Sequence, residues 1–287
     1  MSVSADDRIL LTIIIPCYND GSVLIGCLES ILGQRMRARG EAEIVVVLNG
    51  CTDGSREVAE RHAPAARAAG FPFRILELER PSKPAALNAG DAVARGAVRA
   101  YLDADVVLGP DLLARLLAAL ETDEPRYATG TLVVAPPRSR VTAAYAGFWN
   151  ALVSRDVNGI GLYAVNAAGR ARWGLFPAMH SDDKFVRLSF LPRERVRVPS
   201  RYLWPLPEGW RRLVHVRLRW TEGNLELKRR FPEMTLRQTR AKRPWIYLGA
   251  ARRDPVGFLV FSSIYLACWL LARPDVETEN TVWRRAR

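Results

Sequence analysis

The stretch Arg-Ala-Tyr-Leu-Asp-Ala-Asp at residues 99–105 places two carboxylates, Asp103 and Asp105, directly after a short apolar run. A run of this length that ends in polar residues is typical of a buried β-strand. Carboxylates are ligands that Mg²⁺ and Mn²⁺ prefer, usually together with phosphate oxygens of a substrate. A D-x-D pattern also occurs in solvated turns, but its position after a buried strand favours a metal site.

From residue 9 to about residue 134, short β-branched runs alternate with longer Ala- and Leu-rich segments. The runs predict strands at residues 9–15, 43–48, 73–78 and 99–102. The longer segments predict helices at residues 22–32, 55–69, 84–98 and 110–120. This regular alternation indicates βαβ units around a mostly parallel sheet. Because ligands of such sheets bind beyond the carboxyl ends of the strands, we expect the residues that follow the strands to share one site.

Polar motifs stand at the ends of these strands and at the start of one helix. Residues 16–19 are Pro-Cys-Tyr-Asn, residues 49–55 are Asn-Gly-Cys-Thr-Asp-Gly-Ser, and residues 83–88 are Lys-Pro-Ala-Ala-Leu-Asn. The sequence contains no G-x-x-x-x-G-K-[ST] loop and no G-x-G-x-x-G turn after the first strand. It therefore supports neither a P-loop nor a dinucleotide-binding fold, and a nucleotide held by metal and loop contacts remains.

Together these motifs resemble those of the inverting family-2 glycosyltransferases, which have the GT-A fold. The resemblance covers residues 9–225 and rests on the order and spacing of short segments, at residues 16–19, 49–55, 83–88, 103–105, 161–164, 176–183 and 217–220. It implies an α/β GT-A catalytic domain at residues 1–225, a Rossmann-like sheet flanked by helices. The nucleotide-sugar half would be residues 1–134 and the acceptor half residues 135–225. Residues 226–287 would form a basic and apolar C-terminal helical extension.

The resemblance also implies roles for individual residues. Those expected around the nucleotide sugar are Pro16, Tyr18, Asn19, Asn49, Asp53, Lys83, Asn88, Asp103 and Arg219. Asp105, together with Asp103, would hold Mn²⁺ or Mg²⁺, and His215 is either a further ligand or a structural histidine. Asp182 and Asp183 occupy the place of the family's Glu-Asp motif, whose second acid is the general base. We therefore expect Asp183 to be that base.

Such a set of groups suits the transfer of a sugar. A sugar hydroxyl is a poor nucleophile, and a nucleoside diphosphate carries negative charge as it leaves. A carboxylate can take the proton of the hydroxyl, and a cation can stabilise the developing charge. One base and one metal ion suffice for direct displacement, which inverts the anomeric centre, whereas the usual glycosidase needs two carboxylates flanking the bond. The acidic pair after Ser181 also suits a helix N-terminus, and the two interpretations are compatible.

Two positions depart from the family pattern and narrow the prediction. Asn49 stands where many relatives have Asp, and an amide can accept from N3–H of uracil or thymine and donate to O4. We therefore expect a UDP or dTDP sugar as donor in preference to a GDP sugar. Val216 stands where processive members have Gln in the Q-x-x-R-W motif, which favours the transfer of a single sugar.

The net charge of +12 on 287 residues is unevenly distributed. Residues 1–183 contain 19 Lys and Arg against 21 Asp and Glu, whereas residues 184–287 contain 23 against 9. No nucleic-acid motif accompanies the basic segment, and prolines interrupt it, so we expect no nucleic-acid partner. An acidic, polyprenyl-diphosphate-linked acceptor would explain the charge instead.

Within the basic region, residues 255–272 form an uncharged stretch. A helix that is apolar all round must be buried in protein or in lipid. We expect this one either to contact a membrane, lying at its interface or re-entering it, or to pack on the catalytic domain or on a second subunit of a homodimer. Since the first apolar run is too short for a secretory signal, we expect a cytoplasmic enzyme, peripheral at the inner face of the cell membrane.

The sequence thus predicts a metal-dependent, inverting glycosyltransferase that moves one sugar from a nucleotide donor to an envelope polysaccharide or a lipid-linked acceptor. A nucleotidyltransferase acting on a sugar phosphate would share the nucleotide-binding core, but it would release pyrophosphate. A non-catalytic, membrane-bound assembly partner is the alternative from a different class.

Overall fold

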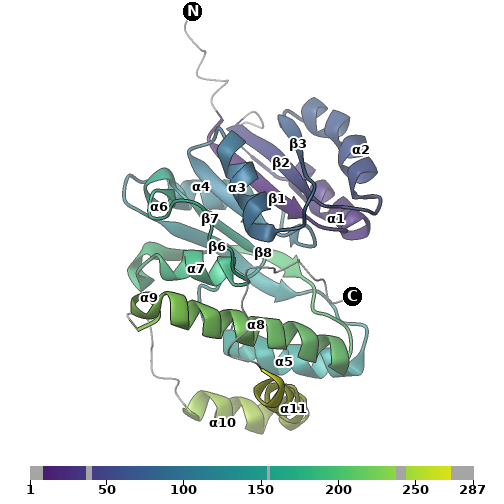
Figure 1. Ribbon diagram of the computed structural model, residues 1–287, viewed down its shortest axis with the longest axis vertical. Coiled ribbons are helices and arrows are strands. Elements are labelled where there is room, and N and C mark those ends of the chain that lie inside the picture. Colours follow the sequence, from purple (N-terminus) through teal and green to yellow (C-terminus); the bar gives the residue numbers. More distant parts are fainter. Residues whose placement is uncertain (1–8, 37–40, 154–155, 237–243, 273–287) are drawn as a thin grey trace, which may run out of the picture.

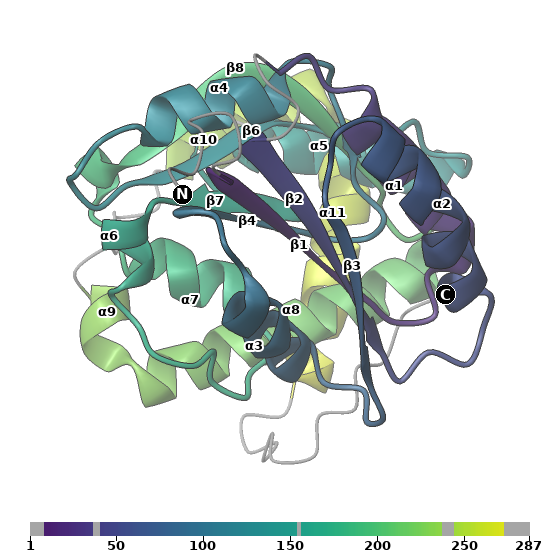
Figure 2. The ribbon, with the colours of Figure 1, turned by 90° about the horizontal axis from the view of Figure 1, so that it is seen from above.

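The computed structural model describes residues 9–36, 41–153, 156–236 and 244–272. Within these ranges the strands form one eight-stranded sheet, and helices lie against both of its faces (Figure 1; Figure 2). The order across the sheet is β3-β2-β1-β4-β7-β6-β8-β5. In chain order the strands are β1 (Leu11–Cys17), β2 (Ala42–Asn49), β3 (Phe73–Leu78), β4 (Val98–Leu102), β5 (Val107–Leu108), β6 (Tyr127–Val134), β7 (Leu162–Val165) and β8 (Arg195–Trp204).

The strands β1 to β4 are those that the sequence predicts, and they pair in parallel. Strands β1 and β2 are buried along their whole length, and their successive apolar side chains enter different layers. In β1, Ile13 and Ile15 belong to the buried cluster that includes Leu24, whereas Ile14 belongs to the cluster that includes Leu87. The helices of this half are α1 (Gly21–Leu32), α2 (Ser55–Ala68) and α3 (Lys83–Val93), whereas α4 (Leu112–Leu120) packs on β6 and β8.

Helix α3 ends at Val93, whereas the sequence predicts an end at residue 98. That predicted end is five residues too late. Ala94 has an extended backbone. Two residues later, a Cβ on Gly96 would lie only 2.6 Å from the carbonyl carbon of Leu11, so the chain there runs closely against β1. This close approach leads directly into β4, which a longer helix would prevent.

The second half of the sheet is mixed. Strand β7 pairs antiparallel with β4 and β6, and β8 pairs parallel with β6 and antiparallel with β5. The helices of this half are α5 (Arg140–Val153), α6 (Ala167–Arg170), α7 (Asp182–Leu188), α8 (Trp210–Arg230), α9 (Pro232–Leu236), α10 (Pro244–Arg253) and α11 (Pro255–Leu271). A short 3₁₀ helix, Pro192–Glu194, precedes β8. Figure 1 shows α5 and α8 between the sheet and α11.

The C-terminal segment is continuous with the domain that it follows. The expected boundary after residue 225 falls inside α8. Helix α11 then returns to pack on α5 and α8. Packing on the catalytic domain, one of the two alternatives for residues 255–272, is therefore realised on one face of α11. No helix among the described residues is both long and apolar enough to cross a membrane.

Candidate active site

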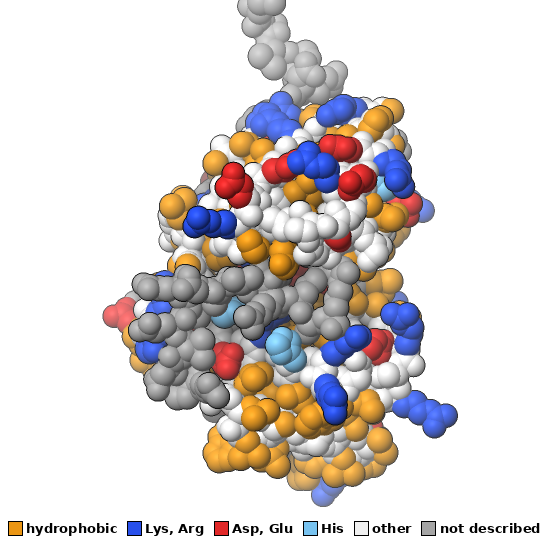
Figure 3. Space-filling model, turned by 45° about the vertical axis from the view of Figure 1, so that its right-hand side comes forward, with side chains coloured by type: hydrophobic (Ala, Val, Ile, Leu, Met, Phe, Trp, Pro, Cys, Tyr) orange, Lys and Arg blue, Asp and Glu red, His pale blue; other side chains and the backbone are white. Residues whose placement is uncertain are grey.

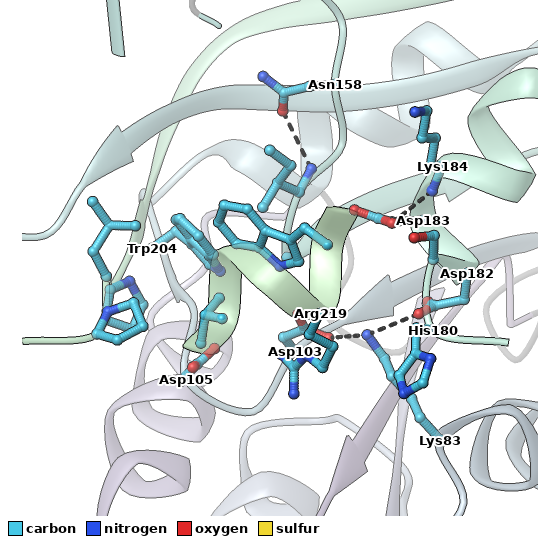
Figure 4. Close-up of a pocket in the computed structure, with 18 of the residues that line it drawn as sticks. Lys83, Asp103, Asp105, Asn158, His180, Asp182, Asp183, Lys184, Trp204 and Arg219 are labelled. Carbon is cyan, nitrogen blue, oxygen red and sulfur yellow. Dashed lines mark hydrogen bonds and ion pairs between the residues drawn. The ribbon is translucent and has the colours of Figure 1, made fainter. Parts of the chain in front are cut away.

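A cavity of about 900 Å³ opens between the carboxyl ends of the parallel strands and the helices α7 and α8 (Figure 4). Pro16 of β1 and the residues that follow β4 form one side of it. The N-terminal turn of α7 and one face of α8 form the other side. Of the residues expected at the site, Pro16, Lys83, Asp103, Asp105, Asp182, Asp183 and Arg219 line this cavity.

The loop after β4 presents Asp103 and Asp105 to the cavity. The backbone N–H of Asp103 donates to the carbonyl of Gly161 (2.8 Å), which ties this loop to the start of β7. Gly161 has φ of +74°, and a Cβ there would lie 2.7 Å from Cδ1 of Trp204. Only glycine fits this position, so the Gly161 predicted as part of a motif has a packing role beside the acids.

Asp105 has the properties of a ligand for a divalent cation. Its Oδ1 atom is buried and has no hydrogen-bond partner among the described residues. Burial, together with the neighbouring carboxylate of Asp103, raises the pKa of Asp105 to about 7. A bound cation would favour the ionised form of this carboxyl group.

Lys83 connects the two acidic pairs. Its Nζ lies 2.9 Å from Oδ1 of Asp103 and 3.3 Å from Oδ1 of Asp182. Burial alone would lower the pKa of Lys83, but the carboxylates of Asp103 and Asp182 outweigh it and hold that pKa well above its usual value. The lysine is therefore a permanent positive charge between the strand side and the α7 side of the cavity.

Asp182 and Asp183 begin α7, as expected for acids at a helix N-terminus. Ser181 stands at the N-cap position, and its side chain makes no capping hydrogen bond. Oδ1 of Asp183 accepts a hydrogen bond from the backbone N–H of Lys184 (2.6 Å). Burial and the adjacent Asp182 raise the pKa of Asp183 to about 6, in the range that suits a general base near neutral pH.

Helix α8 faces these acids with a mixed surface. Val216, Arg219 and Trp220 line the cavity, as their spacing of three and four residues requires for one helix face. Burial lowers the pKa of Arg219, while the four carboxylates around it oppose that shift. His215 is exposed on α8 and is not among the cavity-lining residues. The structure therefore does not bring His215 to the expected metal site.

Five further residues expected around the nucleotide do not line the cavity and instead shape the loops beside it. Asn19 has φ of +52° and accepts from Thr52 N–H (2.7 Å) through its side chain. The carboxylate of Asp53 accepts from the backbone N–H groups of Gly21 (3.1 Å) and Ser55 (3.0 Å). The set is Tyr18, Asn19, Asn49, Asp53 and Asn88.

Asn49 and Asn88 are the two members of that set whose amides hold neighbouring backbone. Asn49 is fully buried, and its Oδ1 accepts from the N–H of Ser82 (2.8 Å). Asn88 makes two hydrogen bonds with Phe176: its Nδ2 donates to the carbonyl (3.2 Å) and its Oδ1 accepts from the N–H (2.7 Å). Asn88 thus holds the segment that leads to Asp182 and Asp183.

A wall of three tryptophans was not predicted as part of the site. Trp149, Trp204 and Trp220 line the cavity, with ring centroids 5.7, 5.9 and 6.2 Å apart in pairs. They come from α5, β8 and α8, so no local pattern in the sequence links them. The available signal was Trp220 in the Arg-Leu-Arg-Trp motif, which the sequence shows next to Arg219.

A sheet of this topology, with one acidic pair after β4 and a second at the start of α7, defines an α/β enzyme of the GT-A type, which confirms the predicted fold class. Residues 12–157, about half of the chain, match the family described as Glycosyl transferase family 2. The chain belongs to this family.

Solved structures show the same fold at low sequence identity. The chain is similar to the mannosyltransferase PcManGT from Pyrobaculum calidifontis, in complex with GDP-Man and Mn²⁺, with a TM-score of 0.61 and 20% identity over 93% of this chain and 76% of that chain. It is also similar to TarS from S. aureus in complex with UDP-GlcNAc, with a TM-score of 0.56 and 14% identity over 93% and 74% of the two chains. At such identities the likeness concerns the fold alone.

Curated relatives match a part of the chain. The uncharacterized glycosyltransferase YibD of Escherichia coli (strain K12) is 35% identical over 115 residues, 39% of this chain and 31% of the relative. The glycosyltransferase AglE of Haloferax volcanii is 32% identical over 95 residues, 33% of this chain and 30% of the relative. The matched region spans about a third of the length of these curated relatives.

Proposed function

We propose that this chain transfers a single sugar from a nucleotide-sugar donor to an acceptor hydroxyl, with inversion and with the help of a divalent cation. The observation that carries this proposal is that one cavity holds two acidic pairs, Asp103 with Asp105 and Asp182 with Asp183, joined by Lys83. Membership of the glycosyl transferase family favours this function over nucleotidyl transfer. The nucleotide sugars bound by PcManGT and TarS support the donor class.

The residues present fit a Mn²⁺ or Mg²⁺ ion. Among the described residues no group of three or more His, Cys, Asp or Glu side chains is arranged to hold a metal ion unaided. These cations are often held by one or two carboxylates plus substrate phosphates, so Asp105 with Asp103 and a diphosphate would form a sufficient set. When bound, the cation would stabilise the negative charge that develops on the leaving diphosphate.

The protein's own side chains would carry out the proton transfer and the charge balance. Asp183, as the base, takes the proton of the acceptor hydroxyl while the oxygen of that hydroxyl forms a bond to the anomeric carbon. The bond from that carbon to the diphosphate oxygen breaks on the opposite side, so the configuration inverts. Arg219 supplies a fixed positive charge towards the diphosphate. Burial raises the pKa of Asp182 beside the base, and the paired Lys83 opposes that rise.

Two finer parts of the proposal concern the donor and the acceptor. We propose a UDP or dTDP sugar on the amide character of Asn49, which can both accept from and donate to a pyrimidine; because this side chain is fully buried outside the cavity, it would have to turn towards the base to do so. We propose an envelope polysaccharide or a lipid-linked glycan as acceptor, reached from the inner face of the cell membrane. The basic charge of residues 184–287 supports an anionic acceptor.

Release of nucleoside diphosphate from a panel of UDP, dTDP and GDP sugars, with Mn²⁺ or Mg²⁺, tests the proposal. Turnover should require the cation, and Asp105→Ala should weaken nucleotide binding in the presence of the cation. The exposed acid Asp123 offers a matched control, since Asp123→Asn should change neither value. The central claim would be overturned if no donor is turned over and if Asp105→Ala leaves the nucleotide affinity unchanged. The donor preference would be overturned if GDP binds more tightly than UDP and dTDP.

A further inference from the structure

The helix α11 is apolar all round, but the protein covers only one of its faces. The buried residues Gly257, Phe261, Ile264 and Cys268 recur at intervals of three and four, which places them on a single face. No charged side chain interrupts the helix between Pro255 and Leu271. The remaining apolar side chains therefore need a partner that the described residues do not supply.

Specific contacts fix the rotation of α11 about its own axis. The ring of Phe261 stacks on Tyr145 of α5 with centroids 5.7 Å apart, and lies 5.0 Å from the ring of Phe148. From α8, Nε1 of Trp210 donates to Oγ of Ser263 (3.1 Å). The helix cannot turn its outer face inward without losing these contacts.

The outer face is a row of large, exposed apolar side chains. Leu259, Leu266 and Leu270 are 67%, 55% and 67% exposed, and their spacing of seven and four residues aligns them opposite the buried face. Trp269, at 71%, lies beside them. In Figure 3, hydrophobic side chains gather at the end of the molecule where α10 and α11 lie in Figure 1. Patches of this kind mark interaction sites.

The charges next to this face select the partner. Arg252 and Arg253 are exposed where α10 meets α11, and Arg211 follows the tryptophan that bonds to α11. The nearest acid along the chain, Asp254, is occupied as the N-cap of α11, accepting from Gly257 N–H (2.8 Å). A basic rim would repel the same rim of a second copy, whereas it would attract the anionic surface of a lipid bilayer.

We propose that this outer face of α11 docks the protein on an anionic lipid bilayer, with the helix lying in the plane of the interface. The 17 residues of α11 would reach roughly 26 Å at ~1.5 Å per residue, short of the ~30 Å hydrocarbon core, so the helix lies along the surface instead of crossing it. Because α5 and α8 separate α11 from the sheet, the cavity stays above the lipid. The inference rests on the proposed function only in that a lipid-linked acceptor would then be presented beside the cavity.

Co-sedimentation of the full chain with vesicles tests the proposal. The wild type should partition onto vesicles of phosphatidylcholine with phosphatidylglycerol, should partition less onto phosphatidylcholine alone, and should be released by salt. The double variant Leu259→Asp/Leu266→Asp should lose on the order of a hundredfold in partitioning, because two leucines no longer enter the lipid. Leu175→Asp is the matched control: Leu175 is 77% exposed but lies in the loop between α6 and α7, so this variant should partition like the wild type.

Two measurements keep the result interpretable. Titration with UDP and Mn²⁺ should give the same affinity for the double variant as for the wild type, so that loss of vesicle binding with nucleotide binding intact supports the docking face itself. Failure of both proteins to bind any nucleotide would count against the proposed function and leave the vesicle result standing. The lipid proposal would be overturned if the wild type does not bind vesicles but forms a dimer by light scattering, while the double variant is monomeric. The outer face of α11 would then bind a second copy of the chain.

Discussion

The proposed role of Asp183 as the general base makes activity depend on the protonation state of this residue. Burial and the neighbouring Asp182 raise its pKa to about 6. A base works only when deprotonated, so kcat/KM should fall as the pH drops through about 6 and should level off above it. Asp183→Asn should lower kcat by about 10²–10⁴-fold and leave nucleotide affinity unchanged.

The measurement is a pH–rate profile of sugar transfer at saturating cation, with Asp123→Asn as the control that should reproduce the wild-type profile. A wild-type profile without an acid limb between pH 5 and 7, or an Asp183→Asn enzyme that turns over normally, would assign the base to another group.

Asn88 should act on catalysis through the chain segment that it holds. Both of its hydrogen bonds go to the backbone of Phe176, six residues before the acidic pair. Asn88→Ala leaves a part-buried carbonyl and N–H without these partners, at a cost of about 1–3 kcal/mol in the free energy of unfolding. We expect kcat to fall with little change in the nucleotide Kd, because Asp182 and Asp183 lose their positioning.

The variant Asn88→Asp separates this role from a direct contact with the nucleotide. A carboxylate can still accept from the Phe176 N–H but cannot donate to its carbonyl, so the loss should be partial. An unchanged kcat accompanied by weaker nucleotide binding would instead place Asn88 in the donor site, as the sequence alone suggested.

The close packing of α3 on the sheet requires a glycine at position 90. A Cβ on Gly90 would lie 2.5 Å from Cγ2 of Ile14 and 3.4 Å from Val47. Gly90→Ala should therefore destabilise the fold by about 1–3 kcal/mol through overpacking, as measured by denaturant unfolding. Gly249→Ala in α10 is the contrast, since a Cβ there meets nothing within 4 Å, and it should be neutral or stabilising. Equal effects of the two substitutions would show that α3 shifts freely on the sheet.

The elements also show which parts of the fold a sequence can predict. Strands β1 and β2 are buried on both faces, and all four strands β1 to β4 stand out as short runs rich in apolar residues, so their existence and order were predictable. Strand β8 was missed although its burial alternates from Val198 to Trp204. Its partner β6 lies some 60 residues away, and Arg197, Pro199 and Arg201 make the segment resemble a basic loop.

Some of the site residues were likewise predictable from the sequence, and others were not. Asp103, Asp105, Asp182 and Asp183 were predictable because each pair belongs to a short motif, and the structure brings both to one cavity. The bridging role of Lys83 was not predictable, because it depends on how α3 and α7 approach each other on one face of the sheet. Neither was the use of the Asn49 and Asn88 amides as backbone partners, since an amide in a sequence does not reveal what it bonds to.

The charge of the molecule is divided unevenly along the chain. Residues 1–183 are nearly neutral, whereas residues 184–287 carry the excess of Lys and Arg. The cavity itself is lined by acids as well as bases, so the basic excess lies outside the reacting groups. At the end of α8, Arg230 donates to the carbonyl of Ala178 (2.6 Å) and pairs with Glu226 (2.9 Å), which gives it a structural role. Its neighbours Lys228 and Arg229 are exposed.

Reversing the charge of those two exposed residues should therefore weaken the capture of an anionic acceptor without damaging the fold. Lys228→Glu/Arg229→Glu should raise the KM for a polyprenyl-diphosphate-linked acceptor about tenfold, or more at low salt, and the difference should shrink as salt screens the charges. The KM for the donor and the midpoint of denaturant unfolding should stay at wild-type values. Arg61→Glu, on the exposed side of α2, is the control for net charge alone. An equal rise in acceptor KM for this variant would mean that the molecule attracts its acceptor through its total charge and not through a surface at the end of α8.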